Sequence, residues 1–121
     1  MKENIIKNKS FDFAVRIVKL NQYLCNNKKE FVLSKQILRS GTSIGANIHE
    51  AVGSESKKDF IHKLGIAVKE ARETSYWLNL LKDSNYLPID EFDRLNNLCD
   101  ELIRILNSII LTTKERYIAN S

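Results

Sequence analysis

The chain has 121 residues with one proline, four glycines and two cysteines, and 43% of its residues are hydrophobic. This length suits one domain over residues 1–121, with a core spanning about 11–113, and the scarcity of proline and glycine argues against turn-rich all-β folds. A net charge of +4 and a pI near 9.1 permit contact with nucleic acid without requiring it.

The sequence carries no obvious targeting signal. The opening residues 1–7 contain no apolar segment as long as that of a signal peptide, and no apolar run reaches the roughly 18 residues of a membrane span. Cys25 and Cys99 lie far apart, each without a second Cys or His at ligand spacing, which is typical of reduced thiols. We therefore expect a cytoplasmic protein without membrane contacts.

Apolar periodicity predicts two helices in the first half of the chain. The first is expected over about 11–26, after polar residues 1–10 that are expected to fray. The second is expected from about 34 to 54, with Ser34 as its N-cap.

The second half of the chain predicts two further helices. The third is expected over 57–83, where Ser56 and Asp59 resemble a capping box. The fourth should begin at a cap formed by Asp90 and fade after Thr113. Short connections between the four helices predict an all-α fold, an antiparallel up-down-up-down four-helix bundle.

Small residues crowd the second predicted helix, in the stretch Arg39-Ser-Gly-Thr-Ser-Ile-Gly-Ala-Asn-Ile-His-Glu50. Two glycines, two serines and a threonine within seven residues cost roughly a few kcal/mol of helix propensity. A helix tolerates this where small side chains let another helix approach closely. We therefore predict that this helix is buried and tightly packed.

Three blocks of the sequence carry a family resemblance: residues 39–50, 56–64 (SKKDFIHKL) and 67–78 (AVKEARETSYWL). Together they closely resemble the bacterial four-helix bundle protein family, also called the 23S rRNA intervening-sequence protein family. The resemblance implies a four-helix subunit that forms a homopentamer and has no established enzymatic activity. It also implies a relationship to the accessory protein of diversity-generating retroelements, a basic pentamer that binds nucleic acid.

Several polar and aromatic residues lie inside these blocks. The candidate structural or interface residues are Arg39, Ser43, Asn47, Glu50, Glu70, Glu73 and Trp77. We expect Arg39 to pair with Glu70 or Glu73 while Ser43 and Asn47 satisfy polar groups in a close helix contact; alternatively, Arg39 is a phosphate ligand. Trp77 and Tyr76 cannot both face one core, so an outward aromatic would mark a self-association surface, unless Trp77 merely covers the bundle end.

Basic residues suggest a nucleic-acid surface at the bundle end that holds the termini and the second connection. The candidate ligands are Lys7, Lys9, Lys57, Lys58, Lys114 and Arg116. Glu55, Asp59 and Glu115 dilute their charge, and the opposite end offers only Lys28, Lys29 and Lys35, which are also diluted. A ring of subunits would repeat the cluster, so that weak phosphate contacts add together.

Enzyme motifs are absent from the sequence. The Glu-x-x-His pair of di-iron bundles is missing, and the nearest match, Asp59-x-x-His62, has no second copy. There is no Gly-rich phosphate loop, Cys-x-x-Cys or nucleophile triad. We expect no catalytic residues, no cofactor and no metal. The favoured function is therefore a non-enzymatic homo-oligomer that binds RNA or DNA, and the alternative is a protein–protein interaction scaffold without a nucleic-acid role.

Overall fold

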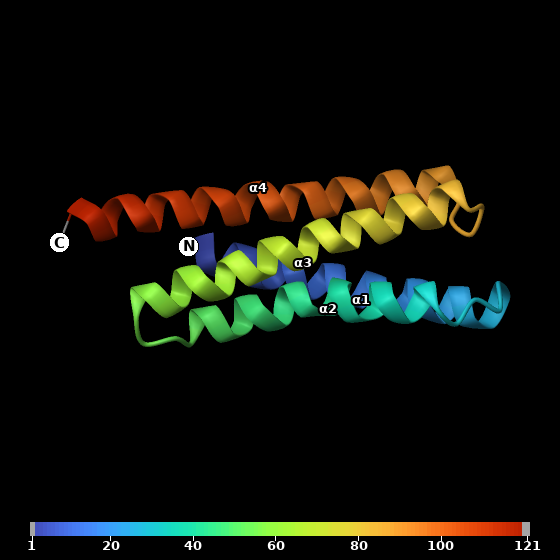
Figure 1. Cartoon of the computed structure of the whole chain (residues 1–121), viewed down its shortest axis with the longest axis horizontal. Coiled ribbons are helices and arrows are strands. Elements are labelled where there is room, and N and C mark those ends of the chain that lie inside the picture. Colours follow the sequence, from blue (N-terminus) through green and yellow to red (C-terminus); the bar gives the residue numbers. More distant parts are fainter. Residues whose placement is uncertain (1, 120–121) are drawn as a thin grey trace.

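The computed structural model describes residues 2–119, which form four helices (Figure 1). Helix α1 spans Lys2–Asn27, α2 Leu33–Val52, α3 Lys57–Asp83 and α4 Ile89–Ala119. Each helix packs against the next one in the chain and runs in the opposite direction, as Figure 1 shows. The predicted all-α, up-down-up-down bundle is confirmed.

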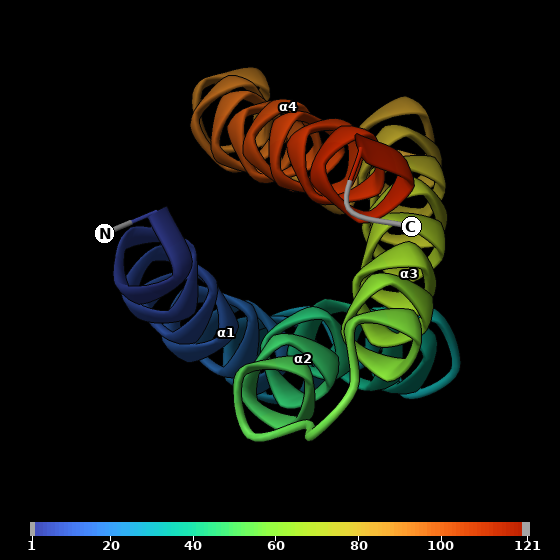
Figure 2. The same cartoon turned by 90° about the vertical axis from the view of Figure 1, so that its left-hand side faces the viewer.

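The fourth side of the bundle is more open than the other three. Contacts between α1 and α4 are sparser than those between helices adjacent in the chain. In the view along the bundle, α1 and α4 stand farther apart than the other neighbouring helices (Figure 2). The core is thus held mainly by the three sequential helix pairs.

Each helix buries one seam whose positions alternate at spacings of three and four residues, the pattern that keeps one face of a helix against its neighbours. The seams are Ile6, Ser10, Phe13, Ile17, Leu20 and Leu24 of α1; Ser34, Ile37, Gly41, Ile44, Ile48 and Ala51 of α2; Leu64, Ala67, Ala71, Thr74, Leu78 and Leu81 of α3; and Phe92, Leu95, Cys99, Leu102, Leu106 and Ile109 of α4.

The small residues of α2 let α1 approach closely. A Cβ atom built at Gly41 would lie 2.8 Å from Cγ1 and Cγ2 of Ile17, and one at Gly45 would lie 3.3 Å from the backbone oxygen of Ser10. The predicted tight packing of this stretch is therefore confirmed, and its helix propensity cost is offset by a contact that larger side chains would prevent.

Two helices are longer than predicted. The expectation that residues 1–10 fray is wrong for the described part, because α1 starts at Lys2 and buries Ile6 and Ser10. The Ser10 hydroxyl donates to the Lys7 carbonyl at 3.0 Å, so the burial of this polar group is satisfied within the helix. At the other terminus α4 continues past Thr113 to Ala119.

One of the three predicted caps is confirmed. The Ser56 hydroxyl accepts from the backbone N–H of Asp59 at 3.0 Å. Ser34 is not a cap but lies buried inside α2, where its N–H donates to the Glu30 carboxylate at 2.8 Å. Asp90 is not a cap either, because α4 begins one residue earlier, at Ile89. In both cases the helix begins one residue before the polar residue that was predicted to cap it.

Candidate nucleic-acid interface

Two of the predicted cations meet where the start of α3 passes the end of α4. Lys58 and Lys114 line the same hollow of about 400 Å³, together with Ile61, Tyr117 and Ile118. The neighbouring predicted cations, Lys57 on α3 and Arg116 on α4, are also exposed. The two helices therefore bring four of the six predicted cations to one end of the bundle.

The other two predicted cations, both on α1, do not line this hollow. Lys9 pairs with Glu101 of α4 at 3.2 Å, so a carboxylate already compensates part of its charge. Lys7 is half-buried, and its carbonyl accepts the Ser10 hydroxyl. Lys7 and Lys9 were predicted to gather with the other four cations, but neither lines a hollow with Lys58 or Lys114.

A second hollow, of about 480 Å³, extends the first one along α3 and α4. The two share Ile61 and Lys114; His62, Gly65 and Lys69 line the second from α3. We call the two hollows together the α3–α4 groove. No Asp or Glu belongs to the described lining of either hollow, so the charged groups that face the groove are basic.

The cations of the groove belong to a longer row on α3. Its positions are exposed and follow one another at spacings of four and three residues, so they share one face. This outer stripe of α3 consists of Lys58, His62, Gly65, Lys69, Arg72 and Tyr76. Of these, only Lys58 was predicted as a ligand. The spacing of basic residues opposite the apolar seam was the signal that could have revealed the rest.

Arg39 of α2 bonds the two carboxylates that neighbour Lys69 and Arg72 in the chain. Its guanidinium bonds Glu70 at 3.1 Å and also bonds Glu73, as predicted, although the sequence left open which of the two would be chosen. Both carboxylates are thereby bonded from α2, and the single guanidinium compensates one of their two negative charges. Within residues 2–119, Lys58, Lys69 and Arg72 form no ion pair.

The remaining residues of the predicted polar set act more locally than expected. Ser43 donates to the Arg39 carbonyl at 2.6 Å and Asn47 to the Ser43 carbonyl at 2.9 Å, so neither bonds across a helix contact. A buried polar contact between α2 and α3 is made instead by Thr74, which donates to Ser40 at 2.9 Å. Glu50 pairs with Lys63 at 3.1 Å, outside the Arg39 network.

The two adjacent aromatics of α3 divide between the core and the outside. Trp77 is half-buried against the core, and its Nε1–H donates to Glu73 at 3.4 Å. Tyr76 is the outward aromatic, with 60% of its surface exposed. It meets the Trp77 ring edge-on, with centroids 5.0 Å apart.

A family model described as 23S rRNA-intervening sequence protein matches residues 2–108. The chain belongs to this family. It is also similar to a crystal structure of a protein with unknown function from the S23 ribosomal protein family of Bacteroides thetaiotaomicron VPI-5482. The two are 56% identical with a TM-score of 0.90, over 91% of this chain and 98% of that one. No curated protein matches the chain.

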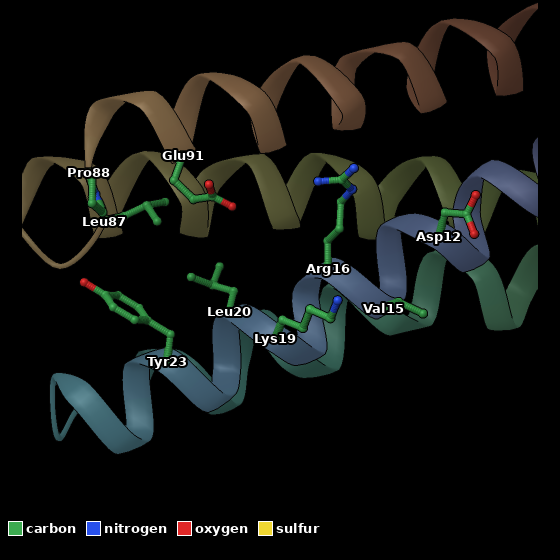
Figure 3. Close-up of a pocket in the computed structure, with 9 residues that line it drawn as sticks. All are labelled: Asp12, Val15, Arg16, Lys19, Leu20, Tyr23, Leu87, Pro88 and Glu91. Carbon is green, nitrogen blue, oxygen red and sulfur yellow. The ribbon is translucent and has the colours of Figure 1, made fainter.

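A third hollow of this intervening-sequence protein lies elsewhere, between α1 and α4, and measures about 640 Å³. Leu20 and Tyr23 of α1 line it opposite Leu87, while Arg16 and Glu91 project into it (Figure 3). Its lining also contains Asp12 and Lys19, so opposite charges balance there. This balance gives the α1–α4 hollow no preference for a polyanion, in contrast to the α3–α4 groove.

Metal ligands, membrane spans and reactive thiols were also sought among the described residues. Within residues 2–119, no group of three or more His, Cys, Asp or Glu side chains could hold a metal ion. No helix in the same range is both long and apolar enough to cross a membrane. Burial raises the pKa of the Cys99 thiol to about 12, helped by the charge of Asp100 and opposed by a backbone hydrogen bond from Ser75. A thiol held neutral in this way is a poor nucleophile.

Proposed function

We propose that this intervening-sequence family member is a non-enzymatic homo-oligomer that binds RNA or DNA through the cations of its α3–α4 end. The observation that carries the proposal is the pair Lys58 and Lys114, which comes from two helices and flanks one hollow whose described lining holds no carboxylate. Lysines without a carboxylate partner are free to bind phosphate oxygens. The resemblance to the basic accessory protein of diversity-generating retroelements supports the same function.

Assembly into a pentamer is the second part of the proposal. Its number of subunits rests on the family resemblance, and the surface of α1 supports association. Phe11, Val15 and Val18 lie on one face of that helix and are exposed, Phe11 by 67%. A row of exposed apolar side chains is typical of a partner surface. Repetition of the basic end around a ring would raise the strength of individually weak phosphate contacts.

A salt titration of binding tests the proposal. Purified, nuclease-treated protein is titrated against labelled RNA and DNA while light scattering measures its mass. We expect saturable binding by a species of about five subunits, weakening by about one log unit in affinity per log unit of salt for each phosphate contacted. Unchanged binding by the variant Lys58→Glu/Lys114→Glu would contradict this choice of surface.

A matched control lies at the opposite end of the bundle. Lys28 and Lys35 are exposed cations near the α1–α2 connection. The variant Lys28→Glu/Lys35→Glu changes the net charge by the same amount as the double reversal at the α3–α4 end. Binding should survive in this control, because a loss there would show that only overall charge matters.

A protein–protein interaction scaffold is the second candidate. The observation that favours it is the exposed apolar pair Phe31 and Val32. Both lie in the α1–α2 connection, at the end of the bundle opposite the start of α3 and the end of α4. An assembled protein that binds neither RNA nor DNA at any salt concentration would favour this function over the first one.

A further inference from the structure

We infer that the α3–α4 groove holds a single strand of nucleic acid, with phosphates along the outer stripe of α3 and a base stacked on Tyr117. This inference rests on the proposed function and narrows it from nucleic acid in general to single strands. Three features of the groove carry it: a row of uncompensated cations, aromatic and apolar surface beside them, and an open floor at Gly65.

The cations form a track of useful length. Lys58, Lys69 and Arg72 lie on one exposed face of α3, and Lys114 of α4 lines one hollow with Lys58 and the other with Lys69. From residue 58 to residue 72 the helix rises about 21 Å, at 1.5 Å per residue. A stacked strand advances about 3.4 Å per nucleotide, so this track can follow about six nucleotides.

The carboxylates beside Lys69 and Arg72 are bonded to another helix. The nearest acidic residues on α3, Glu70 and Glu73, are both bonded to Arg39 of α2. Lys69 and Arg72, which neighbour them in the chain, therefore retain their donors for an external anion. The charge complementarity favours a polyanion that runs parallel to the helix axis.

Aromatic surface at the groove favours exposed bases. Tyr117 is 52% exposed and lines the same hollow as Lys58 and Lys114, with Ile61 and Ile118 beside it. Bases of a single strand present their faces to such a ring, whereas a duplex keeps them inside its own stack. Tyr76, held edge-on by Trp77, offers a second ring at the far end of the outer stripe.

Gly65 keeps the middle of the groove open. A Cβ atom built there meets no heavy atom within 4 Å, in contrast to Gly41 on the core side of α2. This glycine is therefore not required for helix packing. The space lets a strand approach the backbone of α3 between Lys58 and Lys69.

The test compares a fluorescent single strand of about 12 thymidines, within the range of single-strand site sizes, with a duplex of the same length. We expect the assembled protein to bind the single strand at least about tenfold tighter, and Tyr117→Ala to weaken it about fivefold to a hundredfold without changing its salt dependence. Lys69→Ala/Arg72→Ala should instead lower the slope of log affinity against log salt by about 1.4.

Matched controls separate stacking from charge and from folding. Phe31→Ala removes an aromatic of similar exposure from the opposite end and should leave binding unchanged. Tyr117→Phe keeps the ring and should bind the single strand as tightly as the unaltered protein. Gly65→Leu leaves the charge unchanged but fills the groove, and should lower the affinity for the single strand.

Two results would overturn the inference while leaving the proposed function intact. One is equal affinity for strand and duplex with no effect of Tyr117→Ala, while Lys58→Glu/Lys114→Glu still abolishes binding. The other is displacement of the strand by heparin, a polyanion without bases, as efficiently as by unlabelled thymidine strand. Absence of binding to both the strand and the duplex would overturn the inference and the proposed function together.

Discussion

The inner and outer faces of α3 carry residues at the same alternating spacings, and the chemistry of the residues gives them opposite surroundings. Positions 64, 67, 71, 74, 78 and 81 are apolar or small and lie buried in the bundle. Positions 58, 62, 65, 69, 72 and 76 are mostly basic and lie exposed. Spacing decides which residues share a face, whereas side-chain polarity decides whether that face meets protein or solvent.

The largest expected effect comes from breaking the inner face. Leu78→Ala removes a side chain that is fully buried and should lower the free energy of unfolding by about 2–5 kcal/mol. Lys69→Ala on the outer face should change it by no more than about 0.5 kcal/mol. Urea denaturation monitored by circular dichroism measures both, and similar losses for the two variants would contradict the division of α3 into two faces.

A second, smaller loss is expected where α2 meets α1. The methyl group of Gly41→Ala would lie 2.8 Å from two carbons of Ile17, so the two helices must shift apart. We expect a loss of about 1–3 kcal/mol in the free energy of unfolding, despite the better helix propensity of alanine. If the variant is as stable as the unaltered protein, α1 can move away from α2 without loss of stability, and this prediction is contradicted.

Cys99 adds a pH dependence to the buried side of the bundle. Its pKa is about 12 in the folded chain against 9.0 for the free thiol, so the unfolded state loses its proton first as pH rises. The stabilisation is therefore complete below pH 9 and is lost progressively towards pH 12. Between about pH 8 and pH 10.5 the unaltered protein should lose about 2 kcal/mol more than Cys99→Ala. Parallel pH profiles for the two proteins would contradict the raised pKa.

The smallest effect has the opposite sign and lies on the outer face. Gly65→Ala adds a methyl group into open space within α3 and should raise the free energy of unfolding by up to about 1 kcal/mol. Thermal unfolding of this variant beside Gly41→Ala sharpens the comparison, since the same substitution should stabilise at one glycine and destabilise at the other. A loss at both positions would show that the groove is not open at Gly65.

Apolar seams made most of the fold predictable. Desolvation of apolar side chains dominates folding, so the periodicity of Leu, Ile and Phe placed the four helices in the correct order. The start of α1 was missed because, among residues 3–9, Ile6 alone is a buried apolar side chain, and its other neighbours except Ile5 are polar. The prediction of a cap at Ser34 was wrong because the carboxylate of Glu30 accepts from backbone N–H groups at the start of α2.

The candidate site was less predictable than the fold. An exposed face obeys no burial rule, so the cations of the outer stripe did not stand out from an ordinary solvated surface. The groove also depends on α4 continuing past Thr113, because Lys114 and Tyr117 must lie beside the first turns of α3. Pairing of Arg39 with Glu70 and Glu73 was foreseeable from charge. That Lys69 and Arg72 form no ion pair with these carboxylates became clear only from the structure.

The most direct test of the central claim is chemical footprinting of lysines by acetylation, with mass spectrometry, in the presence and absence of the thymidine strand. The claim that the outer stripe of α3 and the end of α4 hold nucleic acid predicts strong protection of Lys58, Lys69 and Lys114. Lys28 and Lys35, at the opposite end of the bundle, should react at the same rate in both samples. Protection of Lys28 and Lys35, with Lys58, Lys69 and Lys114 still reactive, would contradict it.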